Sequence, residues 1–226
     1  ELSNWIAEKP LKGNQPIAIL AREQFSSFGQ NSKTWVSPKG GIWLSAAYPI
    51  FSKEFTSQIF SLSVGIKICE MLRKENINVF LKWPNDILLA KKKVGGILCE
   101  SKISGQSVKA MVVGIGLNLN ETKNDFSEDL NKSATSLSIE SGHTHQRELV
   151  VAIFTTFFEH YWEKLQNSPE EIISEWTSFC GHMEQNISFR FKGIQQSGLF
   201  RGIDNFGQAR VMIDGNERVF PSIILD

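Results

Sequence analysis

The sequence of 226 residues has no excess charge of either sign, little cysteine and no long hydrophobic run. Its 24 lysine and arginine residues balance 24 aspartate and glutamate residues, which argues against the broad basic surface that follows nucleic-acid phosphates. No apolar run approaches the roughly 20 residues of a membrane span, and no signal-peptide pattern is present. We therefore expect a protein without nucleic-acid or membrane partners.

Cysteine and histidine indicate neither a disulfide framework nor a metal site. Cys69, Cys99 and Cys180 are an odd number of cysteines without paired spacing, which predicts reduced thiols and a cytoplasmic location. Cys180 and His182 could form half of a metal site, but no further ligands lie at zinc spacing, so packing is the better interpretation. We expect no metal ion held by protein side chains alone.

The stretch 79–98 predicts an antiparallel meander of three short strands. Its apolar segments are typical of buried strands, and the polar residues between them provide turn chemistry. Proline cannot donate to a strand ladder, so Pro84 belongs at a strand end. The strands are expected at 79–81, 87–89 and 94–98, and the turns at 84–86 and 91–92.

Two lysines and one carboxylate lie near these turns, namely Lys82, Lys93 and Asp86. Paired lysines beside Gly95 and Gly96 suit an anion, because a glycine pair lets the main chain approach a ligand closely. The alternative is a solvated hairpin whose lysines only face water. Composition alone leaves both interpretations open.

A second glycine-containing stretch, Val-Val-Gly-Ile-Gly-Leu-Asn-Leu-Asn, occupies residues 112–120. It is not a dinucleotide fingerprint, because the third glycine is missing and no helical pattern follows directly. No Walker loop is present in the sequence either. A nucleotide, if bound, must therefore be held in another way.

Residues 82–89, Lys-Trp-Pro-Asn-Asp-Ile-Leu-Leu, followed by Lys-Val-Gly-Gly-Ile-Leu at 93–98, closely resemble the signature of biotin protein ligases. Residues 112–120 resemble the next motif of that family, in the right order and spacing. The resemblance covers nearly the whole chain. The sequence is most similar to the shorter, monofunctional type, so we expect no N-terminal DNA-binding domain.

The resemblance implies an α+β fold. A mixed, largely antiparallel sheet packed by helices, as in class II synthetases, is expected over residues 1–182. A small SH3-like β-barrel is expected over residues 183–226, where the residue pattern itself changes to period two. Periodicity predicts helices at 54–74, at 149–165 and from 168 onward, and further strands at 17–21, 42–48, 108–117, 187–191, 198–203, 209–213 and 219–225.

The resemblance also implies a two-step reaction that uses ATP, with Mg²⁺ neutralising the phosphates. Biotin would be activated as biotinyl-5'-AMP and transferred to a lysine of a biotin carboxyl carrier protein. Lys93 is expected to contact both the biotin carboxyl group and the phosphate, Lys82 to approach the phosphates, and Asp86 to accept or orient a proton. A monomer or weak homodimer is expected.

The remaining site residues follow from matching positions in the family motifs. Biotin-binding residues are expected to be Ser3, Asn4, Gln24, Phe28, Gly29, Gln30, Lys93, Gly96 and Gly114. Residues that bind ATP or the adenylate are expected to be Lys33, Trp35, Asn85, Gly116, Asn118 and Phe126. Two alternatives stay open: Ser3 could simply cap a helix starting at Asn4, and Phe126 could be a loop aromatic tucked into the core.

The loop at residues 27–33 departs from the family, which usually has a Gly-Arg-Gly-Arg type sequence here. Only Gly29 and the charge of Lys33 remain, and the arginine that closes over the adenylate is replaced by Gln30. Glutamine cannot offer a charged bidentate fork to a phosphate, so adenylate retention should weaken by about ten- to a hundredfold. A catalytically impaired biotin- or carrier-binding module therefore remains as an alternative. A lipoate- or octanoate-transferring relative is a further alternative, because the resemblance implies a catalytic fold that those enzymes share.

Overall fold

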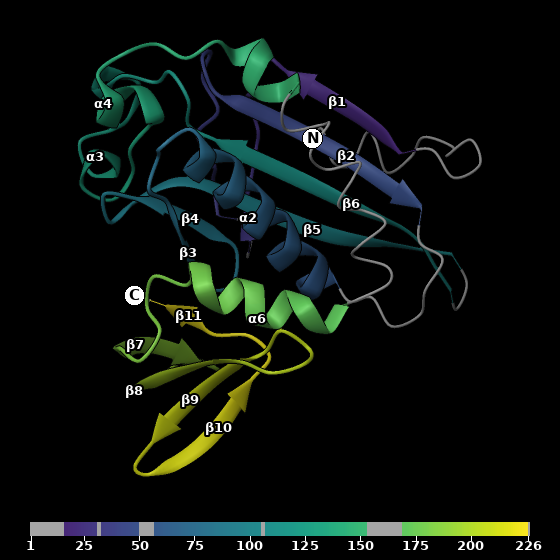
Figure 1. Cartoon of the computed structure of the whole chain (residues 1–226), viewed down its shortest axis with the longest axis vertical. Coiled ribbons are helices and arrows are strands. Elements are labelled where there is room, and N and C mark those ends of the chain that lie inside the picture. The colour runs from purple at the N-terminus through teal and green to yellow at the C-terminus, as the bar shows by residue number, and fades with distance from the viewer. Residues whose placement is uncertain (1–15, 31–32, 50–56, 105–106, 153–168, 226) are drawn as a thin grey trace.

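The computed structural model describes residues 16–30, 33–49, 57–104, 107–152 and 169–225, which form two antiparallel sheets and the helices packed against them (Figure 1). The first sheet has the strand order β1-β2-β6-β5-β4-β3. Its strands are β1 (Ile17–Ala21), β2 (Ile42–Pro49), β3 (Phe80–Lys82), β4 (Asp86–Leu89), β5 (Lys92–Ser104) and β6 (Ser107–Leu117).

The second sheet has the strand order β10-β9-β8-β7-β11 and lies below the first sheet in Figure 1. Its strands are β7 (Asn186–Phe191), β8 (Ile194–Ile203), β9 (Ala209–Ile213), β10 (Asn216–Phe220) and β11 (Ile224–Leu225). The helices are α2 (Ser57–Lys74), η2 (Lys123–Asp125), α3 (Leu130–Ser133), α4 (Leu137–Ser141) and α6 (Pro169–Phe179). The predicted α+β class is confirmed, while the division of the chain between residues 182 and 183 stays a prediction.

Helix α2 packs on one face of the six-stranded sheet because its apolar residues recur every three or four positions. Leu62, Ile66 and Cys69 are all buried in the interface. Gly65 sets the distance between helix and sheet, since a Cβ atom added there would lie 3.1 Å from the Leu81 side chain. The close approach places the β3–β5 meander firmly beside the helix.

The predicted antiparallel meander is confirmed, with shifted bounds at both turns. Asp86, expected in the first turn, already belongs to β4, and the second turn lies one residue earlier than predicted. Ala90 and Lys91 form that turn with positive φ angles of 49° and 65°, and Lys92 already belongs to β5. The shift of the second turn matters because it places Lys92 and Lys93 as neighbours on one strand, where successive side chains point to opposite faces.

The prediction of one strand over 219–225 is wrong, because these residues hold the end of β10 and all of β11. Pro221 lies between the two strands and cannot donate to a ladder. Strand β8 begins at Ile194, earlier than predicted, after a turn in which Lys192 and Gly193 have positive φ. Strands β1 and β9 match their predicted bounds.

Several predictions fall on residues outside the described ranges: Ser3, Asn4, the first residues of the predicted helix at 54–74, and most of the predicted helix at 149–165. The three cysteines are free, as expected. Among the described residues, no helix has the length and apolar character needed to cross a membrane.

Candidate active site

A cavity of about 660 Å³ lies over strands β4, β5 and β6 and is bordered by the 24–37 loop, the 126–134 segment and the end of β11. Ligand pockets of small molecules have this size. All predicted site residues in the described part of the chain line this one cavity: Gln24, Phe28, Gly29, Gln30, Lys33, Trp35, Lys82, Asn85, Asp86, Lys93, Gly96, Gly114, Gly116, Asn118 and Phe126. The structure thus brings together residues that are up to about a hundred positions apart in the sequence.

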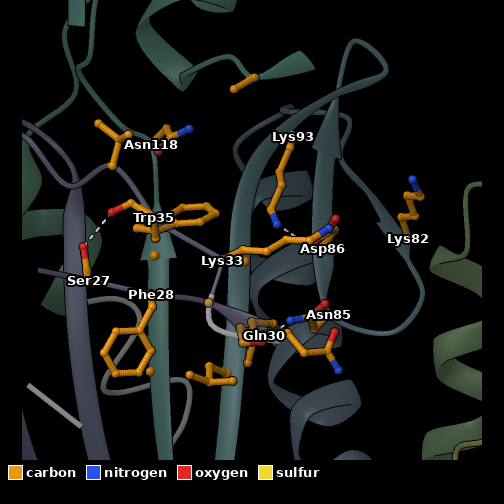
Figure 2. Close-up of a pocket in the computed structure, with 18 of the residues that line it drawn as sticks. Ser27, Phe28, Gln30, Lys33, Trp35, Lys82, Asn85, Asp86, Lys93 and Asn118 are labelled. Atoms are coloured by element: carbon orange, nitrogen blue, oxygen red, sulfur yellow. Dashed lines mark hydrogen bonds and ion pairs between the residues drawn. The ribbon is translucent and has the colours of Figure 1, made fainter. Parts of the chain in front are cut away.

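Lys93 and Asp86 form the central charged pair of the cavity. The Lys93 Nζ atom lies 2.5 Å from Asp86 Oδ1 and 5.0 Å from the centroid of the Trp35 ring. Both side chains are partly exposed, so the pair remains accessible from the cavity. In Figure 2 the Lys93 amine points toward Asp86, and the Lys33 side chain extends toward the same pair.

Gly96 and Gly116 are paired in register on β5 and β6, and the Trp35 indole lies over them. A Cβ atom at Gly116 would lie 2.7 Å from Trp35 Nε1, and one at Gly96 would lie 3.3 Å from Trp35 Cζ3. Without Cβ atoms, the two glycines leave room for the indole, and their contact with a ligand stays a prediction. The Trp35 Nε1 atom is buried and has no hydrogen-bond partner among the described residues.

The 24–37 loop is held by short polar contacts around Ser27. Ser27 Oγ donates to the Trp35 carbonyl oxygen at 2.7 Å and lies 2.7 Å from Ser37 Oγ. Gln24 pairs with Ser37 through a backbone hydrogen bond of 3.0 Å. Sequence reasoning missed Ser27, although a small polar residue in a loop expected to close over a ligand was a usable signal.

Asn85 and Asn118 use their side-chain amides to bind the main chain. Asn85 Nδ2 donates to the Ile97 carbonyl oxygen at 2.7 Å, and Asn118 Nδ2 donates to the Thr135 carbonyl oxygen at 2.9 Å. These bonds fix the turn after β3 and the segment after β6. A contact of either residue with ATP stays a prediction.

Lys82 lines the cavity from β3, but in Figure 2 it lies to one side of the Lys93–Asp86 pair. Burial and the nearby charge of Lys82 lower the pKa of His182 to about 4. Burial also raises the pKa of the Cys180 thiol to about 12, so this thiol and the imidazole 3.4 Å away are both neutral at pH 7. Within the described ranges, no cluster of three or more His, Cys, Asp or Glu residues could hold a metal ion.

The C-terminal sheet contributes Ile223, Ile224 and Leu225 to the cavity wall, which sequence reasoning did not foresee. A contact between residues so distant in the chain leaves no local pattern in the sequence. Lys132 also lines the cavity, from the segment that follows Phe126. The site is therefore built by both sheets.

The chain is similar in sequence to known proteins. Residues 8–118 match the biotin/lipoate A/B protein ligase family. The bifunctional ligase/repressor BirA of Bacillus subtilis is 30% identical over 204 residues, covering 89% of this chain and 62% of that protein. The biotin–[acetyl-CoA-carboxylase] ligase of Paracoccus denitrificans is 27% identical over 209 residues, covering 90% of this chain and 87% of that protein.

The fold agrees as well. The biotin protein ligase of Aquifex aeolicus, solved with biotin and ATP, superposes with a TM-score of 0.84 at 23% identity, covering 100% of this chain and 94% of that one. The chain spans only 62% of the length of the Bacillus subtilis protein and 59% of the length of the corresponding BirA protein of Bacillus spizizenii. Residues 8–118 of this chain thus carry a biotin/lipoate A/B protein ligase family domain, and the chain as a whole is similar in sequence and in fold to biotin protein ligases.

Proposed function

We propose that the chain is a biotin–protein ligase that activates biotin with ATP and transfers it to a lysine of a carrier protein. The observation that carries this proposal is the position of Lys93, whose amine lies in a cavity lined by both family motifs. The names of the relatives in Bacillus and Paracoccus, together with the biotin and ATP in the Aquifex structure, support the choice of substrates.

In the first step, a biotin carboxylate oxygen attacks the α-phosphorus of ATP. A bond forms between that carboxylate oxygen and the α-phosphorus. The bond between the α-phosphorus and the oxygen that bridges to the β-phosphate breaks, and pyrophosphate leaves. Two anions must approach each other, so positioning and a fixed cation lower the barrier. Lys93 supplies that cation, after the substrate carboxylate displaces Asp86 from part of its contact with the amine.

In the second step, a neutral lysine amine of the carrier attacks the acyl carbon, the bond from that carbon to the phosphate oxygen breaks, and AMP leaves. The nucleophile must lose a proton, because only the neutral amine attacks. Asp86 is freed from Lys93 in part when the adenylate occupies the site, and its carboxylate is placed to accept or orient that proton.

ATP would bring Mg²⁺ on its own phosphates, because the described residues offer no cluster that could hold the ion. The metal, when bound, supplies neutralisation of phosphate charge. Lys33, Lys82 and Lys132 add positive charge around the same cavity. The protein side therefore contributes cations and positioning.

Incubation of the full chain with ATP, Mg²⁺ and a biotin carboxyl carrier domain tests the proposal, with biotin, lipoic acid or octanoic acid in parallel. We expect mass spectrometry to show one biotinyl group on the carrier lysine and no transfer of the other two acids. Transfer of lipoyl or octanoyl groups instead would favour that branch of the family. Retained biotin affinity without any transfer would favour a binding module.

A further inference from the structure

We propose that Lys92 and Asn131 are positioning residues that hold Phe126 in the cavity wall, where its ring meets the base of an adenine nucleotide. The inference rests on the proposed function and deepens it, because it names what fixes the nucleotide side of the site. The segment concerned is 121–135, which runs from the end of the second motif past α3. From the sequence we expected Phe126 of this segment to bind ATP or the adenylate, with a loop aromatic tucked into the core as the alternative.

Asn131 is the hub of this segment. Its side-chain amide nitrogen donates to the carbonyl oxygens of Lys123 at 2.9 Å and Phe126 at 3.2 Å. Its backbone nitrogen donates to the Ser127 carbonyl oxygen at 2.9 Å. Because a primary amide has two N–H donors, both donors of Asn131 are used to fix the backbone at the first residue of η2 and at the residue that follows it.

Lys92 links Asn131 to the six-stranded sheet. Its Nζ atom donates to the Asn131 carbonyl oxygen at 2.7 Å. Lys92 is adjacent to Lys93 on β5, so one lysine holds the segment while its neighbour faces Asp86 in the cavity. A charged donor makes this a stronger bond than one between neutral groups.

The far end of the segment is fixed independently. The Thr135 backbone nitrogen donates to the Lys93 carbonyl oxygen at 2.9 Å, and Asn118 donates to the Thr135 carbonyl oxygen. Phe126, whose carbonyl oxygen accepts the hydrogen bond from Asn131, is only 7% exposed yet lines the cavity. An aromatic ring in such a wall can stack on a purine base, and a ring already held in place saves the ordering cost of binding.

The test compares two variants with matched controls in the full chain. Asn131→Asp keeps the shape of the side chain but removes both donors, and Lys92→Met removes the charged donor. Asn124→Asp and Lys123→Met make the same chemical changes at exposed side chains of the same segment. Lys92→Arg keeps a donor and is the conservative rescue. Calorimetry measures the Kd of biotin and of an unreactive analogue of biotinyl-5'-AMP, and thermal melts report folding.

We expect Asn131→Asp and Lys92→Met to weaken binding of the analogue about tenfold, as for the loss of one such bond, while the Kd of biotin stays within twofold. Both controls and Lys92→Arg should bind the analogue like the wild type. Unchanged analogue binding in both variants would overturn the inference, and so would an equal loss of biotin and analogue affinity. If the wild-type chain bound biotin but not the analogue, that result would contradict the proposed function itself, whatever the variants did.

Discussion

The indole nitrogen of Trp83 donates a hydrogen bond of 2.9 Å to the carbonyl oxygen of Gly207, in the turn between β8 and β9. Gln58 of α2 donates to the same oxygen at 2.7 Å. Trp83 lies in the turn that also holds Asn85 and that leads into Asp86 of β4. One carbonyl oxygen of the β8–β9 turn therefore accepts hydrogen bonds from both helix α2 and the turn between β3 and β4. This contact explains why a tryptophan, rather than a smaller apolar residue, suits position 83.

Replacing Trp83 by phenylalanine should destabilise the chain by about 1–3 kcal/mol, because a buried hydrogen bond and part of a packed ring are lost. Urea unfolding followed by circular dichroism measures the change. Phe206→Leu provides a matched control, since Phe206 lies in the same β8–β9 turn but is exposed, and its stability should stay within about 0.5 kcal/mol of the wild type. Equal stabilities of wild type and Trp83→Phe would contradict the structural role.

Replacing Gln30 by arginine should slow the release of biotinyl-5'-AMP. Gln30 lines the cavity, where an arginine would add a charged, bidentate donor for the phosphate. The dissociation rate should fall by about ten- to a hundredfold, as expected for one charge-assisted contact. Stopped-flow displacement of the bound intermediate measures the rate. An unchanged off-rate would mean that residue 30 does not reach the phosphate.

Glu121 should make stability depend on pH. Its carboxyl group is buried without a hydrogen-bond partner among the described residues, and burial raises its pKa from 4.5 to about 7. The folded state therefore keeps the proton over a range in which the unfolded state has lost it, so stability falls between pH 4.5 and 7 and then levels off. The loss should reach roughly 3 kcal/mol.

Glu121→Gln removes this titration, so its free energy of unfolding should exceed that of the wild type at pH 8 and approach it at pH 5. The control is Glu128→Gln, at an exposed position of the same segment. Urea titrations at the two pH values measure the difference. A constant gap between wild type and Glu121→Gln across this range would show that Glu121 titrates normally.

Local patterns predicted the strands well where alternation or turn residues are clear, as for Ile17–Ala21 and Ala209–Ile213. They failed at 219–225, where the apolar residues of two strands run together across Pro221. The predicted site residues come from the family motifs, which mark them individually, and the structure gathers the described ones around one cavity. The indole over the glycine pair and the wall formed by Ile224 could not be predicted, because both depend on contacts between distant parts of the chain.

The central claim is that the Lys93 amine brings the biotin carboxylate and the α-phosphate together. Biotin-dependent exchange of labelled pyrophosphate into ATP measures this step directly. We predict exchange by the wild-type chain only when biotin is present, and a loss of at least about a hundredfold in Lys93→Ala, with an unchanged melting temperature. Exchange at wild-type rates in a folded Lys93→Ala variant would contradict the claim.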